Sequence, residues 1–331
     1  DVFSKDNKEN HDKLRTIGIS TSNLNFFNKN ILNIENLTWN INKIEIFSQN
    51  LDDKKILNFE KENQNLFYIF KNYKLIDNLK SNLKKNKLFN LKKQISYNVL
   101  VKKDYKLIFN CDPKNSITKK FFFKKIDKDY RSYAYTTIIK HKKILNNNIA
   151  KQIFTLNGPL AFLPISSTET SIVYSERGNK NTDLEKLIKK YNTKYEIIKF
   201  SKPSTITLKS SNLRSYYYQN ILAFGDLLHR LHPLAGQGFN MTIRDIKEIL
   251  KIIKFKLDHG LELNNEVLFE FEKNVKHKNY LFSYGIDLIY EFFKLENKLN
   301  NKIISNSVKY FGKKKVINNF FTNYADNGIM I

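Results

Sequence analysis

The residues best suited to bind a cofactor lie between positions 221 and 240. An apolar run, Ile221 to Phe224, ends in Gly225-Asp226, a pattern typical of a buried strand that stops at a ligand crevice. The glycines of Gly236-Gln237-Gly238 let backbone approach a flat molecule closely, because neither carries a Cβ. Asn240 is expected to be the N-cap of a helix with apolar residues at helical spacing. A strand end, a glycine loop and a helix N-terminus together favour a cofactor with an electron-rich pole.

The elements that must position these residues follow two hydrophobic periodicities. Some segments alternate with a period of two, as strands do, and others repeat with the spacing of helices. We therefore expect an α/β domain, a mainly antiparallel β-sheet domain inserted into it twice, and a helical C-terminus. The expected α/β domain comprises residues 1–40, 71–128 and 213–260, the sheet domain residues 41–70 and 129–212, and the helical region residues 261–331.

Composition indicates a globular protein of a reducing compartment. The chain has 331 residues, of which 41% are hydrophobic and 14% aromatic, enough to build a sizeable core. Cys111 is the only cysteine, so the sequence offers no intramolecular disulfide and no cysteine-based zinc site. No metal site is expected.

The formal charge of +25 does not by itself predict nucleic-acid binding. The lysines are spread along the whole chain together with abundant asparagine and isoleucine, which indicates a general compositional bias. Weak attraction to an anionic membrane fits the charge better. The sequence has no apolar run of about 18 residues and starts with polar residues, so neither a spanning helix nor a signal peptide is expected. We expect a cytoplasmic protein, with a peripheral position at the inner face of the membrane as the alternative.

The stretch that contains Gly225-Asp226, His229, Pro233 and Gly236 to Asn240 resembles the second flavin motif of the FAD-dependent aromatic hydroxylases. The closest likeness is to their ubiquinone-biosynthesis branch, whose motif reads roughly G-D-A-A-H-x-x-H-P-x-A-G-Q-G-x-N. The resemblance implies that Asp226 accepts hydrogen bonds from ribityl or ribose hydroxyls. It also implies that a group of residues lines the flavin ring, namely Pro233, Gly236, Gln237, Gly238, Phe239 and Asn240. The family positions of His229 and His232 suggest packing and loop shape, and no catalytic residue is assigned.

Two weaker motifs extend the resemblance. Asp12 and Arg15 fit loosely a family segment whose arginine lies near the ribose or pyrophosphate, although a solvated surface arginine would explain Arg15 equally well. Asp112 and Ser116 match the family's G-A-D-G-x-x-S motif, where we expect Asp112 to be a cofactor-site residue. Pro113 replaces a usual glycine there, which removes a backbone N–H and excludes a positive φ.

No G-x-G-x-x-G occurs in the 331 residues, although a dinucleotide-binding fold normally opens with a strand, this turn and a helix. The family likeness begins only after that unit. We therefore expect a Rossmann-like FAD-binding domain that lacks its first βαβ unit here. A missing N-terminal piece is the simpler explanation, and a relative that has lost the unit is the alternative.

The resemblance implies a flavin-dependent monooxygenase that hydroxylates a polyprenylated phenol ring in ubiquinone biosynthesis. NAD(P)H or another donor would reduce FAD, and O₂ would add to form a flavin C4a-hydroperoxide that transfers oxygen to the ring. The alternative is a diverged flavoprotein of the same fold, either a lipid-binding subunit without catalysis or a prenyl-lipid reductase. Expected partners are a prenylated aromatic substrate, a membrane surface and a ubiquinone-biosynthesis complex, but not nucleic acid. A minority interpretation gives a docking role to Phe292, Phe293, Phe320 and Phe321.

Overall fold

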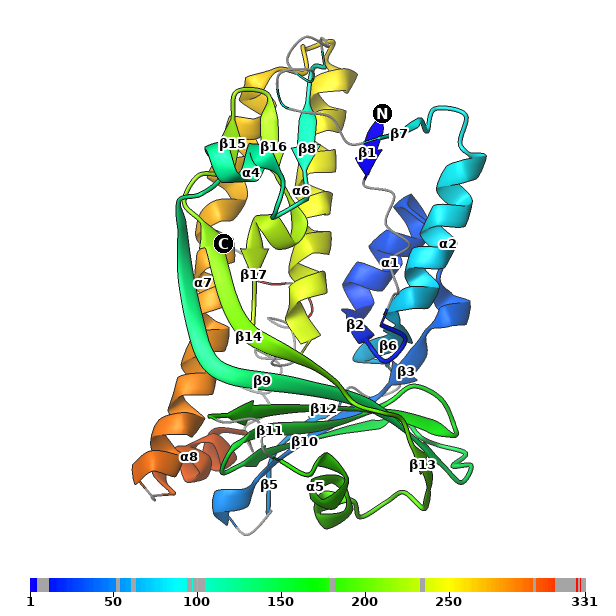
Figure 1. Ribbon diagram of the computed structural model, residues 1–331, viewed down its shortest axis with the longest axis vertical. Coiled ribbons are helices and arrows are strands. Elements are labelled where there is room, and N and C mark those ends of the chain that lie inside the picture. The colour runs from blue at the N-terminus through cyan, green and yellow to red at the C-terminus, as the bar shows by residue number, and fades with distance from the viewer. Residues whose placement is uncertain are drawn as a thin grey trace.

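The computed structural model describes most of the chain. The described residues are 1–4, 12–51, 54–60, 64–93, 97, 100, 105–178, 182–232, 236–299, 302–312, 326 and 328. Figure 1 shows a broad sheet across one end of the molecule and two groups of helices and short strands standing on it.

The broad sheet has nine strands in the described residues. Eight follow the order β17-β14-β9-β12-β11-β10-β4-β5, and β13 also pairs with β9. The pairings are antiparallel except that β4 runs parallel to β10. The strands are β4 (Lys43–Ser48), β5 (Lys54–Glu60), β9 (Lys125–His141), β10 (Ile149–Thr155), β11 (Gly158–Pro164), β12 (Glu169–Arg177), β13 (Ile197–Phe200), β14 (Ser204–Leu213) and β17 (His229–Arg230).

Three smaller sheets belong to the two groups above the broad sheet. One holds β2 (Thr16–Ser20), β6 (Phe67–Lys71) and β3 (Trp39–Ile41), all antiparallel. A second pairs β1 (Val2–Ser4) in parallel with β7 (Leu91–Lys93). The third has the order β15 (Tyr217–Tyr218), β16 (Ile221–Ala223), β8 (Ile108–Asn110), with β16 and β8 parallel.

Most helices lie beside these small sheets or run down one side of the molecule, and one short helix packs on the far face of the broad sheet (Figure 1). They are α1 (Thr21–Asn30), α2 (Asn72–Lys85), α4 (Ser116–Phe121), α5 (Leu184–Tyr191), α6 (Gln237–Asp258), α7 (Asn265–Leu299) and α8 (Ile303–Gly312). The described residues also form three 3-10 turns between other elements: η1 (Glu35–Leu37), η2 (Gln49–Leu51) and η3 (Gly225–Leu227). No helix in the described parts of the chain is long and apolar enough to cross a membrane.

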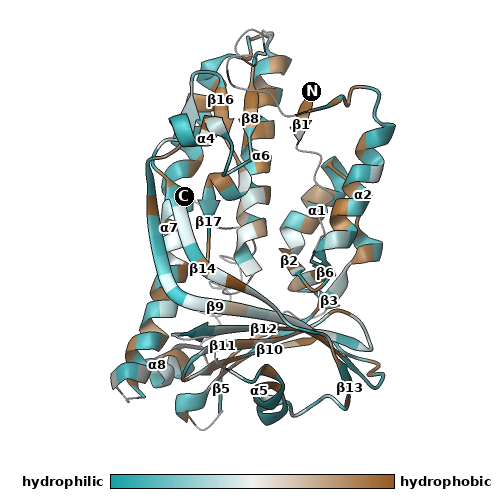
Figure 2. Cartoon of the chain, in the orientation of Figure 1, coloured by the Kyte–Doolittle hydropathy of each residue, from teal (hydrophilic) through white to brown (hydrophobic). Residues whose placement is uncertain are grey.

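Helix α6 connects the hydrophobic cores. Ile249 and Ile252 pack in the core around β8, β16 and the start of α7. Ile243 packs with α1 and β6, and Met241 belongs to a third cluster with α7. Figure 2 shows hydrophobic residues concentrated along β8 and β16 and on the inner side of α6. One helix thus contributes to three of the hydrophobic cores.

The α/β fold with a mainly antiparallel sheet and a helical C-terminus, expected from the sequence, is confirmed. Helix α6 includes the helix that the apolar spacing after Asn240 predicted. The domain limits stay a prediction. Within the expected sheet segment 41–70, β4 and β5 join the broad sheet, whereas β6 pairs with β2 and β3. The expected helix at 316–324 lies outside the described residues.

Candidate functional site

Strand β16 carries Asp226 to one edge of the small parallel sheet. Leu222 and Ala223 are completely buried, as the continuous apolar run requires for a parallel strand. Gly225 follows at φ +62°, a backbone conformation that favours glycine. Asp226 lies in η3, is exposed, and makes no hydrogen bond or ion pair with the described residues. Its carboxylate is therefore available to hydroxyl groups of a ligand.

Strand β8 ends beside β16 and contributes Asp112 to the same edge. Ala223 pairs with Asn110, so the two parallel strands stop at one level. Asp112 closes a tight turn in which its Oδ1 accepts a hydrogen bond from the Lys114 N–H at 2.8 Å. Cys111 immediately precedes Asp112. Desolvation, and then the negative charge of Asp226, raise the pKa of its thiol. The structure thus brings Asp112 and Asp226, which are far apart in sequence, to one edge.

The N-terminus of α6 has no side-chain cap among the described residues. Its N-cap is Gly236, at φ +61°, and no side chain caps the helix. A Cβ at Gly238 would meet no atom within 4 Å, so open space adjoins the first turn. The expectation that Asn240 caps the helix is wrong, because the left-handed conformation of Gly236 starts the helix four residues earlier. Uncapped N–H groups of a 22-residue helix favour a negatively polarised group.

Asn240 ties α6 to β2 and α1 rather than facing a ligand with its side chain. It is completely buried. Its Oδ1 accepts hydrogen bonds from the Ser20 N–H at 2.8 Å and the Asn23 amide at 3.0 Å. Its Nδ2 donates to the carbonyl oxygens of Gly18 at 3.1 Å and Gly236 at 3.2 Å. Asn240 therefore fixes the position of the α6 N-terminus and of Gly236.

The other predicted cofactor residues have different environments. Phe239 packs between Phe27 and Phe70, with ring centroids 6.3 and 6.0 Å away, so its ring belongs to the core. Gln237 is buried in the first turn of α6. Arg15 is exposed just before β2, and no described hydrogen bond or ion pair joins its guanidinium to the other predicted site residues. Pro233 lies outside the described residues. The cofactor roles of all these residues stay predictions.

A buried polar cluster beneath the loop was not anticipated from the sequence. His229 Nε2 lies 2.5 Å from Asp245 Oδ2, and Asp245 Oδ1 accepts a hydrogen bond from the Asn279 amide at 3.0 Å. The sequence contained one signal for it. Asp245 lies four residues after Met241 and four before Ile249, so it falls on the buried face of α6. The cluster joins β17, α6 and α7 and supports the loop between them.

His232 lies in an aromatic cluster. Its ring centroid is 4.7 Å from that of Tyr130 and 4.5 Å from that of Tyr290. Burial, and then the positive charges of Lys128 and Arg177, lower the pKa of His232 to about 4. The imidazole is therefore neutral at neutral pH and packs as an aromatic ring, in line with the packing role that the family position suggested.

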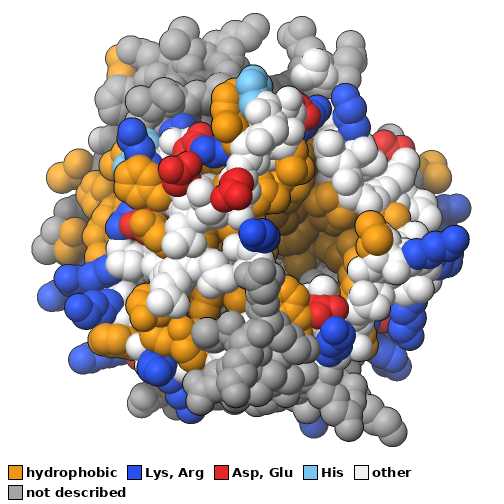
Figure 3. All heavy atoms as spheres, turned by 90° about the horizontal axis from the view of Figure 1, so that it is seen from above, with side chains coloured by type: hydrophobic (Ala, Val, Ile, Leu, Met, Phe, Trp, Pro, Cys, Tyr) orange, Lys and Arg blue, Asp and Glu red, His pale blue; other side chains and the backbone are white. Residues whose placement is uncertain are grey.

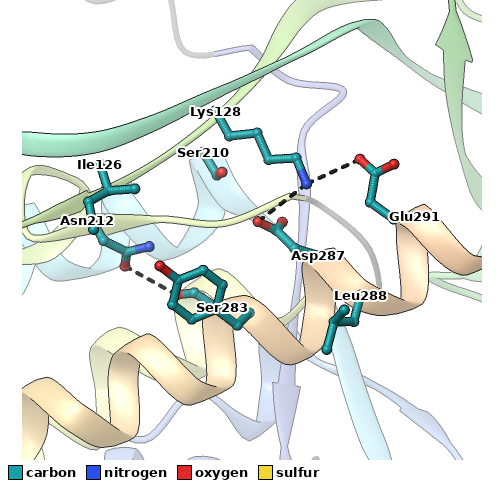
Figure 4. Close-up of a pocket in the computed structure, with 9 residues that line it drawn as sticks. Ile126, Lys128, Ser210, Asn212, Ser283, Asp287, Leu288 and Glu291 are labelled. Carbon is teal, nitrogen blue, oxygen red and sulfur yellow. Dashed lines mark hydrogen bonds and ion pairs between the residues drawn. The ribbon is translucent and has the colours of Figure 1, made fainter.

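A separate cavity of about 220 Å³ lies between α7 and the strands β9 and β14. Lys128 reaches across it to Asp287 and Glu291 of α7, with Nζ–O distances of 3.7 and 3.1 Å (Figure 4). Ser283 donates a hydrogen bond to Asn212 on the opposite wall at 3.1 Å. None of its lining residues is a predicted cofactor residue, and these internal polar contacts already satisfy its charged groups.

The geometry at the end of β8 and β16 fits an FAD molecule. An unpaired exposed carboxylate suits the hydroxyls of a ribityl or ribose group, and the uncapped α6 N-terminus with open space at Gly238 suits the electron-rich pole of a flavin ring. Asp226 and Gly236 to Gly238 would hold the cofactor there, while Asn240 and the His229–Asp245 pair keep the loop in place.

Comparison with known proteins supports the resemblance. No family model matches the chain. The chain is 23% identical over 268 residues to the ubiquinone biosynthesis monooxygenase COQ6, mitochondrial, of Schizosaccharomyces pombe. This match covers 66% of this chain and 56% of that protein. It is 26% identical over 152 residues to the 3-demethoxyubiquinol 3-hydroxylase of Escherichia coli, covering 43% of this chain and 39% of that protein. The match thus spans 56% of the length of the first relative and 39% of the length of the second.

Solved structures show the same fold. The p-nitrophenol 4-monooxygenase PnpA of Pseudomonas putida has a TM-score of 0.73 at 10% identity, covering 99% of this chain and 91% of that one. PqsL of Pseudomonas aeruginosa, described as a probable FAD-dependent monooxygenase, has a TM-score of 0.68 at 13% identity, covering 93% and 91%. The fold is that of the FAD-dependent monooxygenases, and the predicted resemblance to their ubiquinone-biosynthesis branch is confirmed.

Proposed function

We propose that the protein is a flavin-dependent monooxygenase that hydroxylates a polyprenylated phenol in ubiquinone biosynthesis. The observation that carries the proposal is the exposed Asp226 carboxylate at the shared end of β8 and β16, together with the start of α6, which has no side-chain cap among the described residues. The two relatives named for ubiquinone biosynthesis support the substrate class.

Bound FAD would supply the activation of O₂ and the transfer of oxygen to the ring. The protein's own residues then bind and orient the cofactor. Asp226 accepts hydrogen bonds from hydroxyl groups, and the first N–H groups of α6 stabilise negative charge on the ring. The neutral His232 ring packs against Tyr130 and against Tyr290 of α7 and gives this part of the fold an aromatic core. We propose NAD(P)H as the electron donor, since the oxygen chemistry requires a reductant.

The test is flavin retention by an Asp226→Ala variant. The protein purified with FAD should show flavin absorbance near its usual maxima, and the variant should lose at least tenfold in FAD affinity because a charge-assisted hydrogen bond is worth about 1.5–3 kcal/mol. Asp77→Ala is the matched control, since Asp77 is an exposed aspartate on α2. Unchanged affinity in Asp226→Ala would contradict the assignment.

A diverged flavoprotein remains the second candidate, and Pro113 in place of the usual glycine favours it. Incubation with a polyprenylated phenol, NAD(P)H and O₂ separates the candidates. A hydroxylated product supports the hydroxylase. Reduction of an isoprenoid double bond supports a reductase, and tight binding of the phenol without flavin or turnover supports a lipid-binding subunit.

We also propose that the protein associates peripherally with a membrane through α7. Five hydrophobic side chains lie at helical spacing along α7 and are 47 to 53% exposed: Leu281, Tyr284, Leu288, Phe292 and Leu295. They form a stripe about 21 Å long at 1.5 Å per residue. Of the aromatic residues suggested from the sequence, Phe292 lies on this stripe. Phe293 does not, because it stacks on Phe154 in the core at 3.6 Å. Phe320 and Phe321 lie outside the described residues.

The net charge of +25 complements an anionic lipid surface, which is why we favour a membrane over a protein partner for the stripe. Co-sedimentation with vesicles of phosphatidylglycerol and phosphatidylcholine tests the proposal. Leu288→Glu should weaken sedimentation several-fold, whereas Leu257→Glu, at a similarly exposed leucine on α6, should not. Equal sedimentation of both variants would refute a role for α7.

A further inference from the structure

The cavity between α7 and the strands β9 and β14 is lined by two kinds of uncharged side chain. Three of its lining residues are buried polar residues, and three are hydrophobic residues that are 37 to 53% exposed. The polar ones are Ser210, Asn212 and Ser283, and the hydrophobic ones are Ile126, Tyr284 and Leu288. Such a lining suits an amphiphile that enters with its polar end first. The volume of about 220 Å³ is below the about 300–1,000 Å³ typical of sites for drug-sized molecules, so the cavity admits a headgroup rather than a whole lipid.

The charged side chains of the cavity place one cation opposite two anions. Lys128 reaches from β9 toward Asp287 and Glu291 of α7, which lie on one helix face (Figure 4). The three side chains are 19 to 35% exposed, so water screens their ion pairs and a ligand can exchange them at small cost. A purely anionic ligand would meet two carboxylates, and a purely cationic ligand would meet the Lys128 ammonium. A zwitterion instead offers a group of opposite charge to all three.

Two of these charged groups are held in place without a ligand. The Tyr130 hydroxyl donates a hydrogen bond to Asp287 Oδ1. Lys128 lies over the ring of the same tyrosine, with Nζ 5.2 Å from the ring centroid. Because the tyrosine fixes a carboxylate and an ammonium on opposite walls, little side-chain order has to be gained when a zwitterion binds.

The cavity is continuous with the exposed hydrophobic stripe of α7. Tyr284 and Leu288 line the cavity and also belong to the stripe. They are four residues apart and therefore lie on one face of the helix. A lipid whose chains lie against the stripe has its headgroup beside the cavity. This continuity favours a membrane lipid over a free metabolite as the source of the zwitterion.

We propose that the cavity binds the headgroup of an ethanolamine phospholipid. Lys128 pairs with the phosphate, Asp287 and Glu291 accept hydrogen bonds from the ammonium, and the chains leave along Tyr284 and Leu288. A primary ammonium has three N–H donors for the two carboxylates, whereas the quaternary ammonium of choline has none. The choice of a lipid rests on the membrane association proposed above, and no part of the inference depends on the proposed hydroxylation.

The test uses dihexanoyl-phosphatidylethanolamine, a short-chain lipid that dissolves as monomers, titrated into the 331-residue protein in a calorimeter. We expect saturable binding with one lipid per chain, at least tenfold tighter than that of dihexanoyl-phosphatidylcholine or dihexanoyl-phosphatidylglycerol. O-phosphoethanolamine, which has no chains, should bind at least tenfold more weakly than the lipid. Absence of binding, or equal affinity for the ethanolamine and choline lipids, would overturn the proposal. Equal affinity for O-phosphoethanolamine would overturn a lipid as the ligand.

Two pairs of variants locate the binding. Glu291→Gln and Lys128→Gln should each weaken binding of the ethanolamine lipid at least tenfold with unchanged circular dichroism. Their matched controls are Glu266→Gln and Lys209→Gln, because each of these residues also forms an exposed ion pair, on α7 and β14, but does not line the cavity. Both controls should bind like the unmodified protein. Equal affinity of Glu291→Gln and Glu266→Gln would show that the lipid binds elsewhere.

Phe292→Glu separates this inference from the proposed membrane association. Phe292 belongs to the stripe but does not line the cavity. The variant should sediment several-fold less with vesicles and bind the monomeric lipid with unchanged affinity. Loss of monomer binding in this variant would contradict the assignment to the cavity. Tight monomer binding by an unmodified protein that does not sediment with vesicles would support the cavity and refute the membrane association.

Discussion

The sharpest stability prediction concerns Asn240, because its amide makes four hydrogen bonds in a site without solvent access. Asn240→Ala removes all four and leaves the Ser20 N–H and the Asn23 amide without this acceptor. At about 1 kcal/mol for each hydrogen bond, the free energy of unfolding should fall by about 2–5 kcal/mol, the range allowing for partial relaxation. This is a large part of the about 5–15 kcal/mol typical of a folded protein.

Urea unfolding followed by circular dichroism measures the effect. Asn78→Ala is the control, because Asn78 is an exposed asparagine whose amide bonds only to the Lys74 carbonyl within α2. It should change the free energy of unfolding by less than about 0.5 kcal/mol. Asn240→Asp keeps the acceptor oxygen but replaces the donor that serves Gly18 and Gly236, so it should also destabilise. A loss below about 0.5 kcal/mol in Asn240→Ala would refute the role of this side chain as a clamp between α6, β2 and α1.

Three further predictions concern conformation and charge. Gly236→Ala should lower the free energy of unfolding by about 1–2 kcal/mol, because φ is +61°, whereas Gly238→Ala should not destabilise in urea titrations but should weaken FAD binding. Gly158→Ala should cost more than about 3 kcal/mol or abolish folding, measured by soluble yield and thermal unfolding, because the new Cβ would lie 1.9 Å from the Ser175 carbonyl oxygen. The pKa of His232 is lowered from 6.5 to about 4 in the folded protein. The buried neutral imidazole therefore contributes its full stabilisation above pH 6.5, and this contribution is lost as the pH falls from 6.5 to about 4. The free energies of unfolding of the protein and of His232→Phe, measured by urea titration, should therefore diverge on acidification, by on the order of 3 kcal/mol at about pH 4.

Local sequence patterns were sufficient to predict the elements that carry the site. The apolar run before Gly225-Asp226 and the periodicity after Gly238 depend only on neighbouring residues, and they predicted β16 and α6. The structure adds that Asp112 and Asp226 lie at one sheet edge, because the parallel strands β8 and β16 end there at the same level.

The roles of individual polar residues could not be predicted in the same way. Asn240 has the composition of an N-cap, but the left-handed Gly236 starts the helix earlier, and the amide instead bonds to residues more than 200 positions away in sequence. The partners of Asp245 could not be predicted from neighbouring residues either, because His229 and Asn279 lie on two other elements. A polar residue on a buried helix face indicates that partners exist without naming them.

The parallel pairing of β4 with β10 has a consequence for how the chain folds. Lys43 pairs with Ile149, which comes much later in the chain, and within the sheet β10 is linked through β11 and β12 to the long strand β9. Contacts between such distant segments carry a high loop-closure cost and slow the search for the native state. On a ribosome, β4 and β5 leave the exit tunnel well before the strand that they need. Until β10 has been synthesised, the apolar face of this hairpin stays exposed. Strands β4 and β5 can therefore join the broad sheet only after β10 is available.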